Sequence, residues 1–566
     1  MHYRFDPPGK KFPNHDGSGP GLEHLPQALL DRHGARVLHP NSVPVADGWP
    51  TPRSTVYRAR TLLVPPRLLR GPFLGQINGV LERVGMNLVP LTKPSELSDD
   101  QELAWSVITD DSEIVTVAVL VPLREQGRSP VVVDAWTALT ALRDATGDRY
   151  FPLVDKGQVR ENDLSLTAAD VREITLEHLL VGTMITGSPE IDGNPEIDGN
   201  PAIPPYLSGS GDGRIPVDVY LDAPPRPDLA DCQGKYGRRP VIAVLDTGPR
   251  VHPWLDVTSA GGTYQINPND GFVQIDPTMQ AAILSLGKAA DQAGDHDRKP
   301  IKTPWDTPET SDPLVGVLEP SVGHCSFISG IFRQVVPEAT VLSLRVMHSD
   351  DVVNEGELIA ALALLAARVA KVQASASPQS DMIDAISLSL GYYNESPSDV
   401  TYSSGLWKVL QKLLGMGVPV FCAAGNNSRA RHFWPAAFST VSAGPGTPPV
   451  FSVGALNPNK TRAMFSDDGE WVTAWASGAS VVSTFPTDIK GGLMPVEKEE
   501  GRETLNPDDF RSGLCVWNGT SFSAPALAAV FLKALLKDAQ AAPLTDAAQA
   551  ATVARAVQAL QAMGWP

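Results

Sequence analysis

The chain has 566 residues, more than one compact core usually holds, so at least two domains are expected. Hydrophobic residues make up 42% and charged residues 19%, a balance that is typical of globular protein and argues against global disorder. The formal net charge of -18 argues against partners such as nucleic acid or a membrane surface, because their phosphate groups would be repelled.

The sequence predicts a cytoplasmic protein. Residues 1–20 are polar and rich in Gly and Pro, without the apolar run of a signal peptide. The most apolar helical pattern, residues 358–372, is interrupted by Arg368 and Lys371 and is shorter than the roughly 20 residues that cross a bilayer. The 4 cysteines show no CxxC spacing, so neither a zinc site nor a disulfide scaffold is indicated, and reduced thiols are expected.

Residues 1–185 are predicted to form a smaller α+β amino-terminal domain. Apolar patterning places strands at 56–64, 86–91 and 114–123 and helices at 74–84 and 135–145. The resulting order, β-α-β-β-α, is compatible with a ferredoxin-like arrangement.

A linker is predicted at residues 186–215. The stretch is rich in Pro, Gly and Ser and contains the hexapeptide PEIDGN twice in tandem, at 189–194 and 195–200. Such turn-forming residues cannot bury a core, and two copies are too few for a solenoid. The stretch therefore separates two domains.

Residues 216–566 show apolar strands that alternate with longer helical patterns, which predicts an α/β domain with a doubly wound, mostly parallel sheet and helices on both faces. The predicted strands are 241–245, 341–346, 383–388, 418–423 and 451–454, and the predicted helices are 324–332, 355–372, 404–416 and 521–536. In such a sheet, ligands bind beyond the carboxyl ends of the strands.

Two titratable residues are candidates at that edge. Asp246 ends the apolar run Val-Ile-Ala-Val-Leu and is followed by Thr-Gly, although a lone Asp-Thr-Gly is more often an Asx-turn. His324 opens a helical pattern after Val-Gly, where a helix N-terminus would favour the neutral imidazole. A core histidine with a backbone partner is an equally good interpretation of that segment alone.

The segment Asn518-Gly-Thr-Ser521-Phe-Ser-Ala-Pro525 precedes an apolar helix. Ser521 would open that helix, so the free N–H groups of the first turn would face a negative oxygen forming beside it. An ordinary Ser N-cap is the alternative. Asn426 follows Ala-Ala-Gly at the end of another strand, where its amide could donate to an oxyanion or simply occupy a tight turn.

Taken together, the Asp-Thr-Gly, Gly-His, Ala-Ala-Gly-Asn and Gly-Thr-Ser-x-x-x-Pro motifs, in that order, resemble the subtilisin-like serine proteases (subtilases, peptidase family S8). The resemblance implies a serine endopeptidase with Asp246, His324 and Ser521 as its triad and Asn426 as oxyanion donor. It also implies a peptide or protein substrate lying as an added strand along the substrate-binding residues, which are Ser389, Leu390, Gly391, Ala423, Ala424 and Gly425.

The chain departs from the family pattern in three respects. Cys325 follows the histidine where the family usually has Gly-Thr-His, which raises either thiol sensitivity or a buried small side chain. Insertions at about 258–318 and 486–514 are expected to form loops beside the cleft. The cluster Asp295-His-Asp297 could bind a metal, but a solvated loop is favoured, and no cofactor or calcium site is identified.

Two questions stay open at this stage. Residues 1–185 are either a propeptide that is removed or a retained domain that binds a regulatory or targeting partner. A catalytically dead binding module is disfavoured because all four site positions are present, and an esterase is disfavoured because the second glycine of Gly-x-Ser-x-Gly is missing. Self-cleavage within the linker is expected around residues 206–213.

Overall fold

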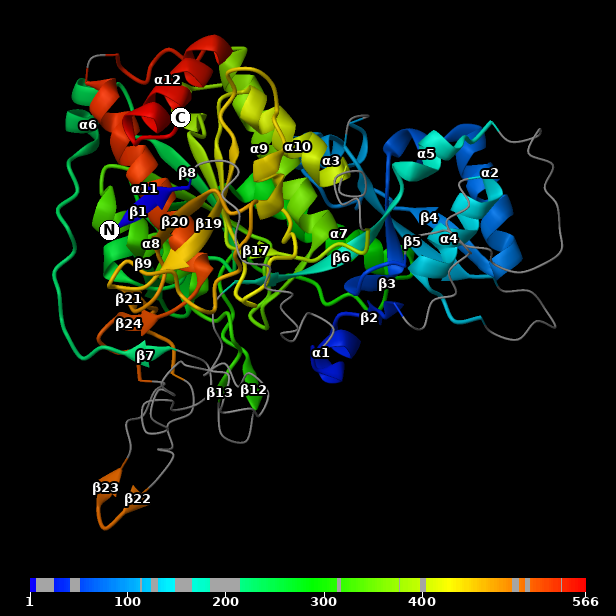
Figure 1. Cartoon of the computed structure of the whole chain (residues 1–566), viewed down its shortest axis with the longest axis horizontal. Coiled ribbons are helices and arrows are strands. Elements are labelled where there is room, and N and C mark those ends of the chain that lie inside the picture. The colour runs from blue at the N-terminus through cyan, green and yellow to red at the C-terminus, as the bar shows by residue number, and fades with distance from the viewer. Residues whose placement is uncertain are drawn as a thin grey trace.

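The computed structural model describes residues 1–6, 25–40, 51–111, 114–123, 131–147, 165–183, 214–312, 317–375, 377–396, 404–490, 498–503, 509–540 and 542–566. These residues form a larger lobe, built mainly from residues 214–566 together with residues 1–6, and a smaller lobe from residues between 25 and 183 (Figure 1). Most of the linker predicted at 186–215 lies outside the described residues.

An eight-stranded sheet runs through the larger lobe. Its order is β1 (Tyr3–Phe5), β20 (Ala474–Ser477), β19 (Val450–Leu456), β18 (Val420–Ala423), β16 (Ala385–Leu388), β8 (Val241–Asp246), β14 (Thr340–Arg345) and β11 (Val273–Ile275). Neighbouring strands are parallel except for β1, which is antiparallel to β20. The predicted mostly parallel α/β sheet is confirmed.

Helices cover both faces of this sheet because successive side chains of a buried strand point in opposite directions. Ala243 and Leu245 of β8 pack with α7 (Pro277–Ala293), α9 (Glu355–Gln373) and α10 (Ser404–Gly415). Ile242 and Val244 pack on the other face with α6 (Leu229–Tyr236), α8 (His324–Val335), α11 (Thr520–Ala539) and α12 (Gln549–Ala562) (Figure 1).

Helix α11 is the one described helix that is long and apolar enough to cross a membrane. Because 78% of its most apolar stretch is buried inside the protein, packing in the core accounts for its apolar side chains. It packs against α8, α12 and the strands of the central sheet.

The smaller lobe contains an antiparallel sheet of order β6 (Thr175–Gly182), β3 (Thr55–Val64), β5 (Thr116–Pro122) and β4 (Met86–Pro90), with β2 (Ala35–Leu38) paired to β3. Helices α2 (Gly71–Leu81) and α4 (Ala135–Ala145) cover one face. On the other side, α3 (Asp99–Thr109) packs against α7 and α9 of the larger lobe. The sequence did not predict α3 or β6.

The insertion at 258–318 was expected to form loops, and this was wrong. Asp276 accepts hydrogen bonds from the backbone of Thr278 and Met279, and Pro277 occupies the first turn, so the segment begins the 17-residue helix α7. Strand β11 of the same insertion joins the edge of the central sheet, and β9 (Val257–Ala260) and β10 (Thr263–Ile266) form a hairpin. The insertion is thus part of the core.

Candidate active site

Asp246 and His324 are hydrogen-bonded at the carboxyl edge of the central sheet. Nδ1 of His324 lies 2.8 and 2.9 Å from the two carboxylate oxygens of Asp246, and both side chains are buried. Asp246 ends β8, and the turn after it needs Gly248, whose φ is 89° and whose added Cβ would lie 2.2 Å from the Pro304 carbonyl oxygen.

His324 is the first residue of α8 and follows Gly323, whose φ is 83°. Its ring lies 5.6 Å, centroid to centroid, from each of the rings of Trp517 and Phe522. Nε2 of His324 has no hydrogen-bond partner among the described residues. The imidazole is therefore held at Nδ1 and leaves Nε2 free for another group.

Ser521 lies in the first turn of α11, as the Gly-Thr-Ser motif predicts. Its backbone N–H donates to the carbonyl oxygen of Thr183 at 2.9 Å, and its Oγ lies 2.8 Å from the hydroxyl oxygen of Thr183. No Ser521–His324 hydrogen bond is present in the described part of the chain. The Ser521 hydroxyl is instead hydrogen-bonded to the hydroxyl of Thr183.

Asn426 follows β18, and its side-chain Nδ2 donates to the same Thr183 carbonyl oxygen at 2.5 Å. The Oδ1 atom of Asn426 accepts from the backbone N–H and the hydroxyl of Thr520, at 3.0 and 2.9 Å. These two bonds fix the orientation of the amide, so that its Nδ2 faces the Thr183 carbonyl oxygen. Two donors from separate elements therefore converge on one carbonyl oxygen.

Asp467 supports the turn that carries Asn426, and no sequence motif indicated this role. Its Oδ1 accepts from the backbone of Asn427 and Arg429, at 2.8 and 2.9 Å. An added Cβ on Gly425 would lie 2.4 Å from Oδ2 of Asp467. Burial raises the pKa of Asp467 to about 7.

Strand β6 of this same chain lies between the two lobes (Figure 1), and its last residues pair on both sides with segments of the larger lobe, which we call the walls of the cleft. Leu390 and Gly391, which form β17, pair antiparallel with Gly182 and Val181. The Ser389 carbonyl accepts from the Thr183 N–H at 3.1 Å, and its hydroxyl donates to the Ser521 carbonyl at 2.8 Å. Three predicted substrate-binding residues thus lie along an added strand.

The other three predicted substrate-binding residues make no hydrogen bond to β6 in the described part of the chain. Ala423 and Ala424 are buried at the end of β18, and the Gly425 N–H donates to the Thr520 hydroxyl at 3.1 Å. The opposite wall is β15 (Val352–Asn354), which the sequence did not indicate. Beside it, the Asp351 carbonyl accepts from the Gly182 N–H at 3.0 Å.

Two carboxyl groups close to the Asp246–His324 pair were not singled out from the sequence, the buried Asp306 and the partly buried Asp351. Oδ2 of Asp306 accepts from the Gly323 N–H at 2.6 Å, and burial raises the pKa of Asp306 to about 6. Asp351 accepts from the Ser321 hydroxyl, and burial raises its pKa to about 7. Asp306 thus holds the backbone just before α8, and Asp351 holds the Ser321 side chain three residues before His324.

Cys325 is fully buried, and burial raises the pKa of its thiol, so it packs as a small side chain. In the 295–297 cluster, Asp295 pairs with Arg58 at 2.6 Å, Asp297 with Arg60 at 2.7 Å and His296 with Asp291 at 2.8 Å. Among the described residues there is no group of three or more His, Cys, Asp or Glu side chains that could hold a metal ion.

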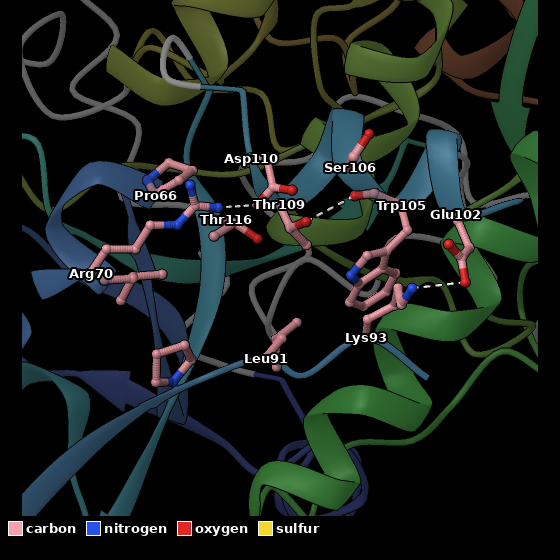
Figure 2. A pocket seen from close by; sticks show the side chains of 12 residues that line it. Pro66, Arg70, Leu91, Lys93, Glu102, Trp105, Ser106, Thr109, Asp110 and Thr116 are labelled. Atoms are coloured by element: carbon pink, nitrogen blue, oxygen red, sulfur yellow. Dashed lines mark hydrogen bonds and ion pairs between the residues drawn. The ribbon is translucent and has the colours of Figure 1, made fainter. Parts of the chain in front are cut away.

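A separate cavity of about 380 Å³ lies in the smaller lobe beside α3 (Figure 2). Its charged side chains pair with one another, Arg70 with Asp110 and Lys93 with Glu102. None of the Asp246, His324, Ser521 and Asn426 side chains lines it. This cavity is therefore distinct from the cleft.

Residues 237–565 match the model of the subtilase family, Peptidase_S8. The chain belongs to the subtilase family. Subtilisin E of Bacillus subtilis (strain 168) is 34% identical to this subtilase over 107 residues, which cover 19% of the chain and 27% of that relative. Subtilisin DY of Bacillus licheniformis is 34% identical over 115 residues, 20% of the chain and 36% of that relative. The matches thus span little more than a third of these relatives at most.

Among solved structures, this subtilase is similar to a lanthipeptide protease, with a TM-score of 0.35 and 16% identity over 57% of the chain and 87% of that structure. It is also similar to a cold adapted subtilisin-like serine proteinase, with a TM-score of 0.32 and 17% identity over 60% of the chain and 88% of that structure.

Proposed function

We propose that the chain is a serine endopeptidase that acts through Asp246, His324, Ser521 and Asn426. The observation that carries this proposal is the carbonyl oxygen of Thr183, which accepts from both the Ser521 N–H and Asn426 Nδ2. An oxyanion forming at that position would meet both donors already in place.

The reaction begins when Ser521 Oγ turns from Thr183 toward the free Nε2 of His324. Oγ then attacks the carbonyl carbon as Nε2 takes its proton, and Asp246 holds Nδ1–H and stabilises the imidazolium. Asn426 Nδ2 and the Ser521 N–H stabilise the negative oxygen. His324 returns the proton to the leaving amine, and water then hydrolyses the ester on Ser521 in the reverse sequence.

The first substrate we propose is the chain itself, cut between Thr183 and the next residue, Met184. Thr183 directly follows β6, a strand that lies between two protease segments as an extended peptide substrate would. Residues 206–213, where self-cleavage was expected from the sequence, lie outside the described residues. The position of Thr183 favours the bond after it instead.

Two measurements test this function. Mass spectrometry of the purified chain should find a fragment of residues 1–183 that grows with time and never forms in Ser521→Ala. A fluorophosphonate should label Ser521 in the wild type and no serine in that variant. Equal cutting of both proteins would assign the break to a contaminating protease and contradict the proposal.

Several expectations from the sequence remain predictions beside this proposal. They are a cytoplasmic location, activity without a cofactor, peptide or protein substrates other than the chain itself, and a regulatory or targeting partner for residues 1–185.

A further inference from the structure

His178 of β6 is held by side chains of the larger lobe. Its Nδ1 lies 2.7 Å from Glu355 Oε2, and its Nε2 lies 2.8 Å from Glu395 Oε2. The ring of Tyr392 stacks on the imidazole, with centroids 4.4 Å apart and planes 20° apart. One side chain of the bound strand thus makes two ion pairs and an aromatic contact.

The binding pocket for His178 is built by the protease part of the chain. Glu355 is the first residue of α9, and its other oxygen accepts from the Tyr392 hydroxyl at 3.1 Å. Oε2 of Glu355 also accepts from the backbone N–H of His178 at 3.1 Å. Both carboxylates are almost fully buried while β6 is in place, with exposures of 2% and 3%.

The charge in this pocket is matched to a cation. Burial opposes the imidazolium of His178, but Glu395 and Glu355 outweigh burial and raise its pKa to about 10. Burial also opposes ionisation of Glu395, but His178 holds its pKa below the ordinary value, and Arg143 of α4 acts in the same direction. Two buried carboxylates without a cation would be costly.

We propose that Glu355, Glu395 and Tyr392 form a substrate subsite that binds a cationic side chain five residues before the residue whose carbonyl faces Ser521. This inference rests on the proposed function. When β6 leaves, the two carboxylates and the tyrosine remain with the protease part, so an incoming peptide is favoured when it restores the missing charge. A neutral or acidic side chain at this position of the peptide would leave the carboxylates of Glu355 and Glu395 unpaired, so such peptides are disfavoured.

The register of β6 defines the other positions of such a substrate. Leu180 is fully buried in the same core as α9, and Val181 pairs with both Val352 and Gly391. Because successive side chains alternate between the two faces of a strand, a cation moved by one residue would point away from the pocket.

The test uses the full-length wild-type protein and acetylated peptides with the sequence Xaa-Leu-Leu-Val-Gly-Thr-Met-Ile-Thr, copied from residues 178–186 with Xaa as Lys, Gln or Glu. We expect kcat/KM for the Lys peptide to exceed that for the Gln peptide about tenfold or more, since hydrogen-bonded charge pairs are of that strength, and the Glu peptide to be poorest. A peptide with Gln at Xaa and Lys in place of the first Leu should lose the gain.

Variants locate the effect on the proposed residues. In Glu395→Gln, and in Glu355→Gln combined with Glu395→Gln, the preference for Lys over Gln should shrink toward equality. Glu470→Gln, an exposed residue, should keep the preference. Fluorophosphonate labelling of Ser521 shows that each variant is folded and that its nucleophile is intact.

Each outcome decides between the two proposals. Equal cutting of the Lys and Gln peptides by the wild type would overturn the subsite but leave the protease intact. Failure to cut any peptide while Ser521 is still labelled would mean that the pocket serves β6 alone, which also overturns the subsite. Failure of both cutting and labelling would contradict the proposed function itself.

Discussion

The carbonyl oxygen of Thr183 lies 2.9 Å from the backbone nitrogen of Ser521, and the hydroxyl oxygens of the same two residues lie 2.8 Å apart. The first contact presents the carbonyl for attack. The second contact holds the serine hydroxyl away from Nε2 of His324, which has no partner among the described residues. Thr183 therefore presents its own peptide bond to Ser521 and at the same time restrains the Ser521 hydroxyl that is proposed to attack that bond.

Thr183→Val should speed self-cleavage. Valine keeps the shape of threonine but removes the hydroxyl, so Ser521 Oγ is free to bond to His324. One hydrogen bond of about 0.5–1.5 kcal/mol corresponds to about twofold to tenfold in rate. The appearance of the 1–183 fragment, followed by mass spectrometry, measures the change. Thr183→Ser keeps a hydroxyl and is the control, and equal rates for all three proteins would contradict the restraint.

Asn426→Ala should slow the chemical step by about 10²–10³, the range known for removal of a subtilisin oxyanion donor. The loss should appear in kcat with little change in KM, because the donor acts mainly as the oxyanion forms. Thr520→Val should give a smaller loss, since it removes one of the two bonds that orient the amide. A change confined to KM would point to substrate binding instead.

Arg298→Met should destabilise the contact between the lobes strongly. The Arg298 guanidinium bonds to Glu177 of β6 and to Asp295 and Glu357 of the larger lobe, all of them buried. Asp295 keeps its pair with Arg58, but Glu177 and Glu357 lose their ion-pair partner, which costs about 3–5 kcal/mol in urea unfolding. The matched control is Lys288→Ala, which breaks the exposed pair with Glu96 and should change little. Similar losses in both variants would contradict this assignment.

Alkaline pH should loosen β6 from the cleft. The pKa of His178 is about 10 when bound and near its ordinary 6.5 when β6 leaves, so its contribution is complete below pH 6.5 and is lost as pH rises through 10. Labelling of Ser521 by a fluorophosphonate should therefore accelerate between pH 7 and pH 10. In His178→Lys the acceleration should be smaller, because lysine keeps its charge longer. Identical pH profiles would contradict the role of His178.

The sequence predicted the central sheet and the positions of the four proposed active-site residues because each motif sits where an apolar strand or helix begins or ends. Asp246 ends β8, and Ser521 opens α11, so short-range patterns were enough. Contacts between distant segments were not predictable in this way. Nothing near Thr183 indicates that it meets Ser521, since that contact depends on how the two lobes pack.

Two helices that were not predicted carry local start signals in the sequence. Ser98 and Gln101 form a capping box that marks the start of α3, and Asp276-Pro277 marks the start of α7. Both helices lie where the lobes meet. Their flanking residues are charged or turn-forming, so the apolar pattern of these segments looks irregular. Asp467 gave no such signal, because a carboxylate that supports a turn has no characteristic spacing.

Strand β1 gives the proposed cut an unusual outcome. Residues Tyr3–Phe5 complete the edge of the larger lobe's sheet, where the Phe5 ring lies 5.2 Å from Trp565 and Asp6 bonds to Arg462 at 2.6 Å. Breaking the chain after Thr183 would therefore produce two polypeptides that share one sheet, like the subunits of a heterodimer. After the cut, β6 would still be attached to the larger lobe through β1 of the same fragment. It could therefore leave the cleft and return as an inhibitor at high effective concentration.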